Sequence, residues 1–179
     1  MATKSTATQY GAVAVTIHWL SALLILALLG SGFRAASLTE SDAKAQILMA
    51  HAPLGILILL LTLARITWWR FADRKPNAVA GSPKWQAWSA KAVHLLLYVI
   101  IIGMTASGIG MLALSGAGPT IFSAAPGPLP DFQQYAPRVP HGIGARAMVA
   151  LLVLHIGAAL YHQFIKKDGT LRRMWFRGA

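Results

Sequence analysis

Four long apolar runs, separated by polar stretches, dominate the pattern of hydrophobic and polar positions in this chain. The runs cover residues 11–33, 45–64, 92–114 and 141–165, and each suits a helix of about 20 residues that crosses a bilayer. The first three runs contain no Asp, Glu, Lys or Arg, and the fourth contains only Arg146. The pattern predicts an all-α membrane protein, a four-transmembrane-helix bundle that forms one domain over the whole chain.

The polar connections between the runs show no sign of a second domain. The first, residues 34–44, includes the segment TESD, which offers a helix N-cap followed by an acidic residue. The second, residues 70–91, is basic and is broken by Pro and Gly. Tryptophans in and beside it suit the membrane interface: Trp68, Trp69, Trp85 and Trp88. The third, residues 115–140, is rich in Pro and Gly and predicts an external loop.

The formal charge of +11 is distributed unevenly over the two sides of such a bundle. Twelve basic residues lie on the side of both termini: Lys4, Arg65, Arg70, Arg74, Lys75, Lys84, Lys91, Lys166, Lys167, Arg172, Arg173 and Arg177. Four lie on the opposite side: Arg34, Lys44, Arg138 and Arg146. Because basic residues collect on the cytoplasmic side of membrane proteins, this bias predicts that both termini are cytoplasmic. The lipid bilayer is the expected partner, and no nucleic acid is needed to explain the charge.

The composition also restricts the chemistry that the chain can perform. Hydrophobic residues make up 56% of it and charged residues 12%, which excludes an ordinary soluble domain. The N-terminal stretch MATKSTATQYGAVAVTIHW has no small-residue cleavage site after a short apolar core, so we expect it to be retained. The chain has no cysteine, which excludes a thiolate-bound cluster and a covalently attached haem. Any redox cofactor must be held non-covalently.

Histidines within the apolar runs are the strongest sign of function. An imidazole is costly inside a bilayer without a partner or a metal, yet the stretch MVALLVLHIGAALYHQF carries two of them. On a helix, the fourteen residues from His141 to His155 correspond to a rise of about 21 Å and leave the side chains about 40° apart. The two side chains therefore share one face of the fourth helix at two depths.

The other two ligand candidates match these depths. In a bundle of alternating helices, His51 lies at the depth of His141 on the outer side, and His18 lies at the inner depth of His155. Two imidazoles that face each other suit the axial positions of haem iron. A zinc site would need three or four ligands at one depth. We therefore predict two non-covalent b-type haems, with the metal ligands His18, His51, His141 and His155.

Two further histidines leave the inner pair open to another assignment. His94 begins the third helix on the inner side, and His162 lies two turns beyond His155 on nearly the same face. Either could replace an inner ligand, although a single histidine at a helix end is also typical of an interfacial or capping residue. Glycines lie near the predicted ligands, where a macrocycle needs room or where helices simply pack closely: Gly55, Gly142, Gly144 and Gly157.

Five stretches of the chain resemble the bacterial cytochrome b561 family, and more broadly the membrane cytochrome b subunits of hydrogenases and formate dehydrogenases. They are TIHWLSALLI, MAHAPLGILILLLTLARITWW, AVHLLLYVIIIGMTASG, PHGIGARAMVALLVLHIGAALYHQF and KKDGTLRRMW. The resemblance covers the chain from Tyr10 to Trp175. It implies a four-helix bundle in the bacterial inner membrane with two b haems, and the same histidine pairs as the depth argument.

The resemblance is compatible with more than one activity. One branch of similar length acts as a superoxide oxidase, which passes electrons from external superoxide to ubiquinone, whereas others pass electrons from quinol or to a periplasmic partner. Ligands on both faces of the iron leave no open position, so outer-sphere electron transfer is expected and no catalytic side chain is predicted. The leading hypothesis is a quinone-linked oxidoreductase between the periplasmic side and the quinone pool. The alternatives are a conduit subunit that anchors a dehydrogenase and a haem-free transporter or structural bundle.

Cations near the predicted haems are candidates for binding their propionate groups. Arg34 and Arg146 lie at the outer depth, and Arg65 lies fourteen residues after His51 at the inner depth. Propionates in a low-dielectric setting need such partners, although an arginine at a helix end also snorkels to the interface without binding anything. Candidates for a quinone pocket or its proton path, with ordinary packing as the alternative, are His94, Tyr98 and His162.

Overall fold

The described part of the chain is built from helices. The computed structural model describes residues 2–79, 81–123 and 128–176. The long helices are α1 (Ala12–Ser37), α2 (Ser41–Thr67), α3 (Lys84–Ser115) and α5 (Arg138–Tyr161). Two π-helical turns, η1 (Trp68–Ala72) and η3 (His162–Lys166), extend α2 and α5. Shorter helices are α4 (Gly118–Phe122), η2 (Phe132–Gln134) and η4 (Leu171–Met174).

The four predicted spans are confirmed as helices that are long and apolar enough to cross a membrane. In the most apolar stretch of each span, at most 17% of the residues are buried within the protein. Most of these apolar residues therefore lie on the outer surface of the bundle, which suits contact with lipid. The helices extend beyond several of the predicted boundaries, and the start of α3 differs most from the prediction. α3 begins at Lys84, directly after Pro83, so Trp85 and Trp88 lie on the helix and not in the connection before it. Both of these tryptophan side chains are exposed, as interfacial anchors should be.

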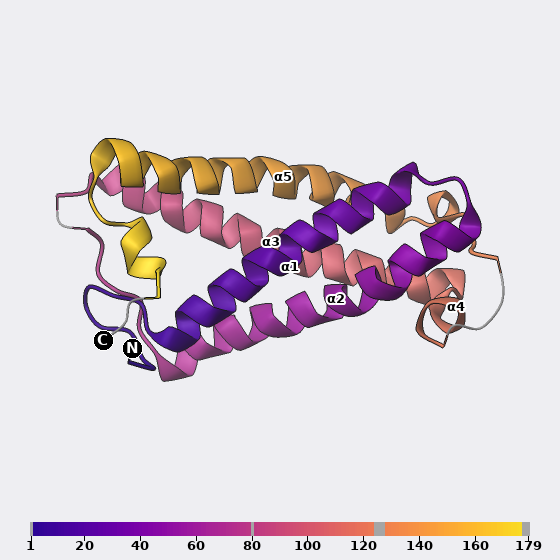
Figure 1. Cartoon of the computed structure of the whole chain (residues 1–179), viewed down its shortest axis with the longest axis horizontal. Coiled ribbons are helices and arrows are strands. Elements are labelled where there is room, and N and C mark those ends of the chain that lie inside the picture. The colour runs from indigo at the N-terminus through magenta and orange to yellow at the C-terminus, as the bar shows by residue number, and fades with distance from the viewer. Residues whose placement is uncertain (1, 80, 124–127, 177–179) are drawn as a thin grey trace.

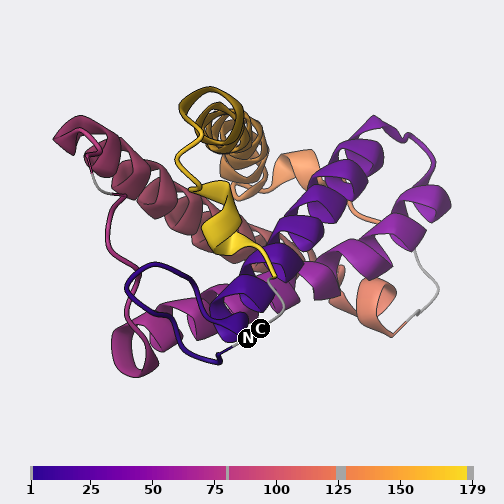
Figure 2. The same ribbon diagram turned by 60° about the vertical axis from the view of Figure 1, so that its left-hand side comes forward.

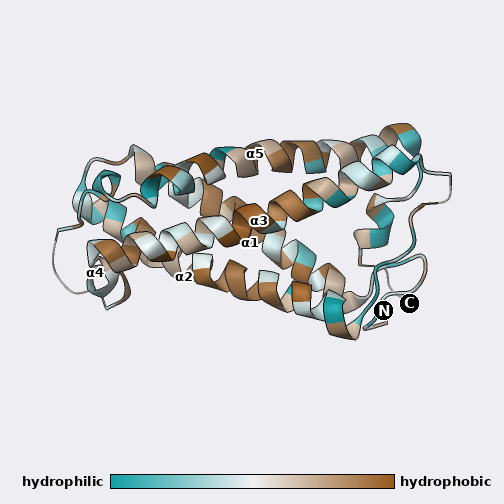
Figure 3. Cartoon of the chain, turned by 180° about the vertical axis from the view of Figure 1, so that it is seen from behind, coloured by the Kyte–Doolittle hydropathy of each residue, from teal (hydrophilic) through white to brown (hydrophobic). Residues whose placement is uncertain are grey.

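The long helices form two antiparallel hairpins (Figure 1). α1 packs against α2, α3 packs against α5, and contacts of α2 with α3 join the hairpins. The two hairpins remain distinct when the bundle is seen from a second direction (Figure 2). Hydrophobic residues dominate the middle of the helices, and hydrophilic residues gather toward the two ends of the bundle (Figure 3). This distribution is typical of a bundle whose long axis follows the membrane normal.

The N-terminal and C-terminal segments lie at one end of the bundle, beside the α2–α3 connection (Figure 1). We call it the terminal end. There, the backbone N–H and hydroxyl of Ser5 donate to the Asp73 carboxylate at 3.0 and 2.8 Å. Arg173 donates to the carbonyl oxygens of Thr8 and Asn77, both at 2.7 Å. Hydrogen bonds therefore join the N-terminal segment, the α2–α3 connection and the C-terminal tail.

The opposite end, which we call the α4 end, contains the α1–α2 connection and the long third connection (Figure 1). Gly116 ends α3 in a left-handed conformation with φ of 68°, which glycine adopts most readily. The chain then forms α4, which contacts α2, and η2, which contacts α5. The backbone N–H of Leu129 donates to the hydroxyl of Ser41 at 3.0 Å. Residues 124–127, and Arg177 of the basic tail, lie outside the described residues.

Candidate functional site

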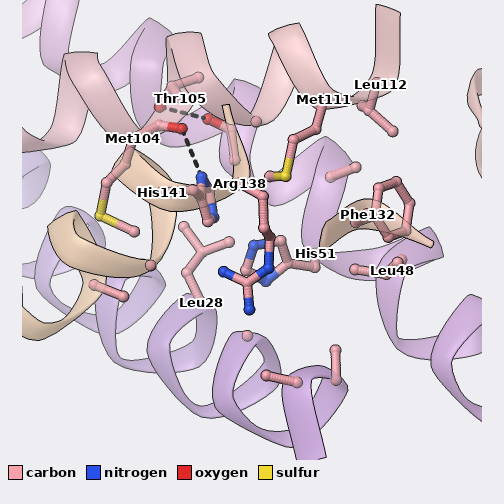
Figure 4. A pocket seen from close by; sticks show the side chains of 18 of the residues that line it. Leu28, Leu48, His51, Met104, Thr105, Met111, Leu112, Phe132, Arg138 and His141 are labelled. Carbon is pink, nitrogen blue, oxygen red and sulfur yellow. Dashed lines mark hydrogen bonds between the residues drawn. The ribbon is translucent and has the colours of Figure 1, made fainter. Parts of the chain in front are cut away.

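Two histidines from different hairpins face each other toward the α4 end. The ring centres of His51 on α2 and His141 on α5 are 6.3 Å apart. Both side chains line an open cavity of about 330 Å³ between the two hairpins, which we call the outer pocket. Figure 4 shows Arg138 reaching into the same space as the two rings. The structure thus brings together the histidine pair that the sequence predicted at the outer depth.

The hydrogen bonds of His51 determine which ring nitrogen carries its proton. Nδ1 of His51 lies 2.9 Å from the hydroxyl oxygen of Ser31 on α1. That hydroxyl donates its own proton to the carbonyl oxygen of Ala27 at 2.7 Å, so its oxygen accepts from His51. A neutral ring with its proton on Nδ1 leaves the lone pair of Nε2 free to bind a metal.

His141 is arranged in the same way on the second hairpin. Its Nδ1 lies 3.0 Å from the carbonyl oxygen of Met104 and 3.0 Å from the hydroxyl of Ser107, both on α3. A carbonyl oxygen can only accept, so Nδ1 of His141 is the donor (Figure 4). Nε2 of this ring is therefore also free. Neither serine was predicted from the sequence, because each acts from the neighbouring helix.

Three histidines meet toward the terminal end. The ring centres of His18 on α1 and His155 on α5 are 6.1 Å apart, as the sequence predicted for the inner pair. The ring of His94 on α3 lies 5.4 Å from that of His155. His94 therefore lies near the inner site, as predicted, although the residue is partly exposed.

Arg65 on α2 is the cation of this inner cluster. Its Nη1 lies 3.3 Å from Nδ1 of His18, and because a guanidinium only donates, this imidazole nitrogen accepts. Nε of Arg65 and Nε1 of Trp69 are buried without a hydrogen-bond partner among the described residues. A buried donor or cation of this kind is costly unless a further group satisfies it. The inner cluster therefore has the chemistry to receive an anionic, oxygen-bearing group.

Both predicted pairs have the separation that a single metal ion between two imidazoles requires. A metal–nitrogen bond of about 2.0 Å, with each ring centre about 1.1 Å behind its nitrogen, places the ring centres about 6 Å apart. The separations of 6.3 and 6.1 Å match this value. The 5.4 Å between His94 and His155 is shorter and fits less well. Within residues 2–79, 81–123 and 128–176, no three His, Cys, Asp or Glu side chains are arranged to hold a metal ion.

The basic residues near the outer pair separate into two groups. Arg138 and Arg146 line the outer pocket, as does Lys44, and Arg146 donates to the carbonyl oxygen of Gly142 at 3.1 Å. Arg34 is exposed at the end of α1 and is not part of this lining. Arg138 was not among the predicted site residues, although its position three residues before His141 places it on the same helix face.

His162 belongs to a separate group at the terminal end. Its Nδ1 is hydrogen-bonded to the carboxylate of Asp168, which also accepts from the backbone N–H and hydroxyl of Thr170 at 3.0 and 2.6 Å. Burial raises the pKa of Asp168, but the hydrogen bonds from Thr170 and His162 outweigh it and leave this pKa below its usual value. His162 is thus held by its hydrogen bond to Asp168 and is not part of either histidine pair.

Comparisons with known proteins agree with this arrangement. The family model for prokaryotic cytochrome b561 matches residues 9–177. Cytochrome b561 homolog 2 of Escherichia coli (strain K12) is 30% identical over 181 residues, which cover 97% of this chain and 95% of that protein. Cytochrome b561 homolog 1 of the same organism is 28% identical over 172 residues, or 93% of this chain and 96% of that protein.

A third relative carries a more specific name. The "Probable superoxide oxidase CybB" of Yersinia pestis is 26% identical over 172 residues, which cover 93% of this chain and 95% of that protein. The family model spans nearly the whole chain, all four spans included. The chain therefore belongs to the prokaryotic cytochrome b561 family, whose members are membrane proteins that bind b-type haem and transfer electrons.

Proposed function

We propose that this protein is a dihaem cytochrome b of the bacterial inner membrane that transfers electrons between the periplasmic side and the quinone pool. His51 and His141 hold one haem, and His18 and His155 hold the other. The ring separations of 6.3 and 6.1 Å are the observation that carries this proposal. When bound, each haem supplies a centre that gains and loses one electron reversibly.

Hydrogen bonding supports these ligand roles. Ser31 and the Met104 carbonyl keep a proton on Nδ1 of His51 and His141, so Nε2 of each ring is available to iron. His18 differs, because Arg65 donates to its Nδ1. Arg65 releases this nitrogen when its guanidinium turns to an anion, and a haem propionate is the anion that this site requires.

Cations at both levels support propionate binding. Arg65 serves the inner site, where its Nε has no other partner among the described residues. Arg138 and Arg146 serve the outer site, because both line the outer pocket beside His141. Arg34 stays a candidate for binding a propionate only because its sequence position places it at the outer depth. An arginine and a carboxylate form a strong charge-assisted pair in such a weakly polar setting.

Charge supports the orientation in the membrane. Eleven of the described basic residues belong to the terminal side of the bundle and four to the α4 side. By the positive-inside rule, the terminal end then faces the cytoplasm and the outer pocket faces the periplasm. Electrons that enter at the outer pair leave from the inner pair, beside His94. Tyr98 and His162 stay candidates for the quinone site from their sequence positions alone.

Superoxide is the external donor that the site suits best. A relative is named a probable superoxide oxidase. Among the described residues, the outer pocket is lined by the cations Lys44, Arg138 and Arg146 and by one acid, Asp131. Each superoxide anion gives up one electron and leaves as oxygen. Two such electrons and two protons from the cytoplasmic side convert one ubiquinone to ubiquinol. Cations around the outer pair attract the anionic donor.

Anaerobic reduction of the purified protein tests this proposal. The protein is reconstituted in nanodiscs with a ubiquinone analogue and mixed either with a superoxide source or with the corresponding quinol, while the haem spectrum is followed. We expect superoxide to reduce the haems rapidly and quinone to reoxidise them. Reduction by quinol alone would favour a conduit to a protein partner. A preparation without a haem spectrum would favour the haem-free transporter or structural bundle.

A further inference from the structure

The same dipeptide contacts a histidine in each hairpin. Ser31 and Gly32 on α1 face His51 on α2, and Ser107 and Gly108 on α3 face His141 on α5. The serine hydroxyls lie 2.9 and 3.0 Å from Nδ1 of the two rings. A Cβ added to Gly32 or Gly108 would lie 3.2 or 3.5 Å from Cε1 of the same ring.

These contacts are specific to the outer pair. Gly30 and Gly103, two residues before Gly32 on α1 and five residues before Gly108 on α3, have open space where a Cβ would be. In the inner pair, the described contact to a ring nitrogen comes from the guanidinium of Arg65, which donates to His18. A hydroxyl that accepts from the ring and a glycine that admits the ring therefore occur together only beside the outer histidines in the described part of the chain.

The serine contact has a direct electronic effect on a metal-bound imidazole. When Nδ1–H donates to an oxygen, electron density moves toward Nε2 and the ring becomes a stronger donor to iron. A stronger donor favours ferric over ferrous iron, which lowers the reduction potential. The glycine sets how closely the ring approaches the neighbouring helix, and so fixes the rotation of the imidazole about its bond to the metal.

From this geometry we infer that Ser31–Gly32 and Ser107–Gly108 are positioning residues that orient the two outer imidazoles and lower the reduction potential of the outer haem. The inference rests on the proposed ligand roles of His51 and His141. A lower potential at the outer centre favours transfer of an electron from that centre to the inner one. The two dipeptides thus bias electron flow from the periplasmic side toward the quinone.

The two serine–glycine dipeptides are not equivalent. Nδ1 of His141 has a second acceptor, the carbonyl oxygen of Met104 at 3.0 Å, whereas the described acceptor for His51 is the hydroxyl of Ser31. Removal of Ser107 leaves His141 in its tautomer, and removal of Ser31 frees His51 to change tautomer or rotate. The glycines also differ, because a Cβ on Gly32 would lie 3.2 Å from the ring of His51, whereas a Cβ on Gly108 would lie 3.5 Å from the ring of His141.

Redox titration of serine variants tests the inference in full-length protein. We expect Ser31→Ala to shift the ferric-to-ferrous equilibrium of the outer haem on the order of tenfold, or about 59 mV upward for a one-electron couple. Ser107→Ala should give a smaller rise, and Ser31→Thr, which keeps the hydroxyl, should restore the original potential. The inner potential should not move. Ser37→Ala on α1 and Ser89→Ala on α3 are matched controls, because both hydroxyls are exposed and bond within their own helix.

Spectroscopy separates positioning from general stability. Gly32→Ala should change the low-spin ferric EPR signal of the outer haem, whereas Gly30→Ala should leave it unchanged. Unchanged outer potentials in Ser31→Ala and Ser107→Ala, with both haems present, overturn the inference. If Ser31→Ala does not assemble with haem, the test rests on Ser107→Ala, and an unchanged outer potential in that variant overturns the inference. Fewer than two haems in the unmodified protein would instead overturn the proposed function.

Discussion

Nη1 of Arg65 lies 3.3 Å from Nδ1 of His18, so a cation from α2 contacts an imidazole from α1 inside the first hairpin. Nε of the same guanidinium is buried and has no partner among the described residues. A buried arginine is stable only when an anion or several acceptors surround it. We therefore propose that an anionic part of the inner haem binds at this contact.

Replacement of Arg65 should weaken the inner site selectively. We expect Arg65→Gln to reduce the affinity of the inner haem by roughly 10- to 100-fold, because its propionate loses a charged partner, while the outer haem stays bound. Haem titration of the purified apoprotein measures both affinities. Arg70→Gln is the control, because this exposed arginine on η1 lies outside the cluster. Equal loss at both sites would point to unfolding and contradict the assignment.

The histidine pairs predict the haem content of single variants. The unmodified protein should contain two haems per chain, and His141→Ala and His155→Ala should each contain one, because each loses one pair. A pyridine haemochrome assay gives the count, and the remaining absorption band identifies the site. His94→Ala and His162→Ala should keep both haems. The ring centre of His94 lies 5.4 Å from that of His155, which is shorter than the separation of about 6 Å that suits a metal ion between two imidazoles. His162 is bonded to Asp168 instead. Loss of a haem from either variant would show that the inner pair is assigned wrongly.

Reduction by superoxide should depend on salt and on the cations of the outer pocket. The second-order rate should fall as ionic strength rises, because salt shortens the range over which charges attract the anion. Arg138→Gln and Arg146→Gln should each lower this rate roughly two- to five-fold at low salt. Stopped-flow absorbance measures the rate. Arg34→Gln should have a smaller effect, and Lys84→Gln at the terminal end should have none. If the second-order rate changes neither with ionic strength nor in the two arginine variants, superoxide is not the donor.

Asp73 predicts a pH dependence of stability at the terminal end. Burial raises the pKa of its carboxyl, but hydrogen bonds from Ser5 and Arg74 outweigh this and leave the pKa below its usual value. A lowered native pKa stabilises the fold above the usual Asp value of about 3.9, and the stabilisation disappears as the pH falls through the native pKa. We expect Asp73→Asn to lower the free energy of unfolding by about 1 kcal/mol at neutral pH and by less in acid.

Thermal unfolding in detergent at neutral and acidic pH measures this difference. Ser5→Ala should reproduce part of the loss at neutral pH, because it removes one of the hydrogen bonds to the carboxylate. Asp42→Asn is the control, since this acid lies in the first turn of α2 at the other end of the bundle. An equal loss for Asp73→Asn at both pH values would mean that its charge has no part in the stability.

Sequence pattern was sufficient for the spans and for the depth of the histidines. The length and hydropathy of a span are local properties, because lipid requires every crossing segment to be a long apolar helix. The rise of 1.5 Å per residue then converts sequence number into depth. This is why His51 with His141 and His18 with His155 could be paired from the sequence, and why the ring separations agree.

Three-dimensional packing was needed to learn what surrounds each ring. Ser31 is 20 residues from His51 in the sequence, and Ser107 is 34 residues from His141. Arg138 lines the outer pocket where Arg34 does not. Such neighbours depend on how each helix is rotated about its own axis. In lipid, no hydrophobic contrast between the faces of a helix determines this rotation, so close packing between the four helices sets it.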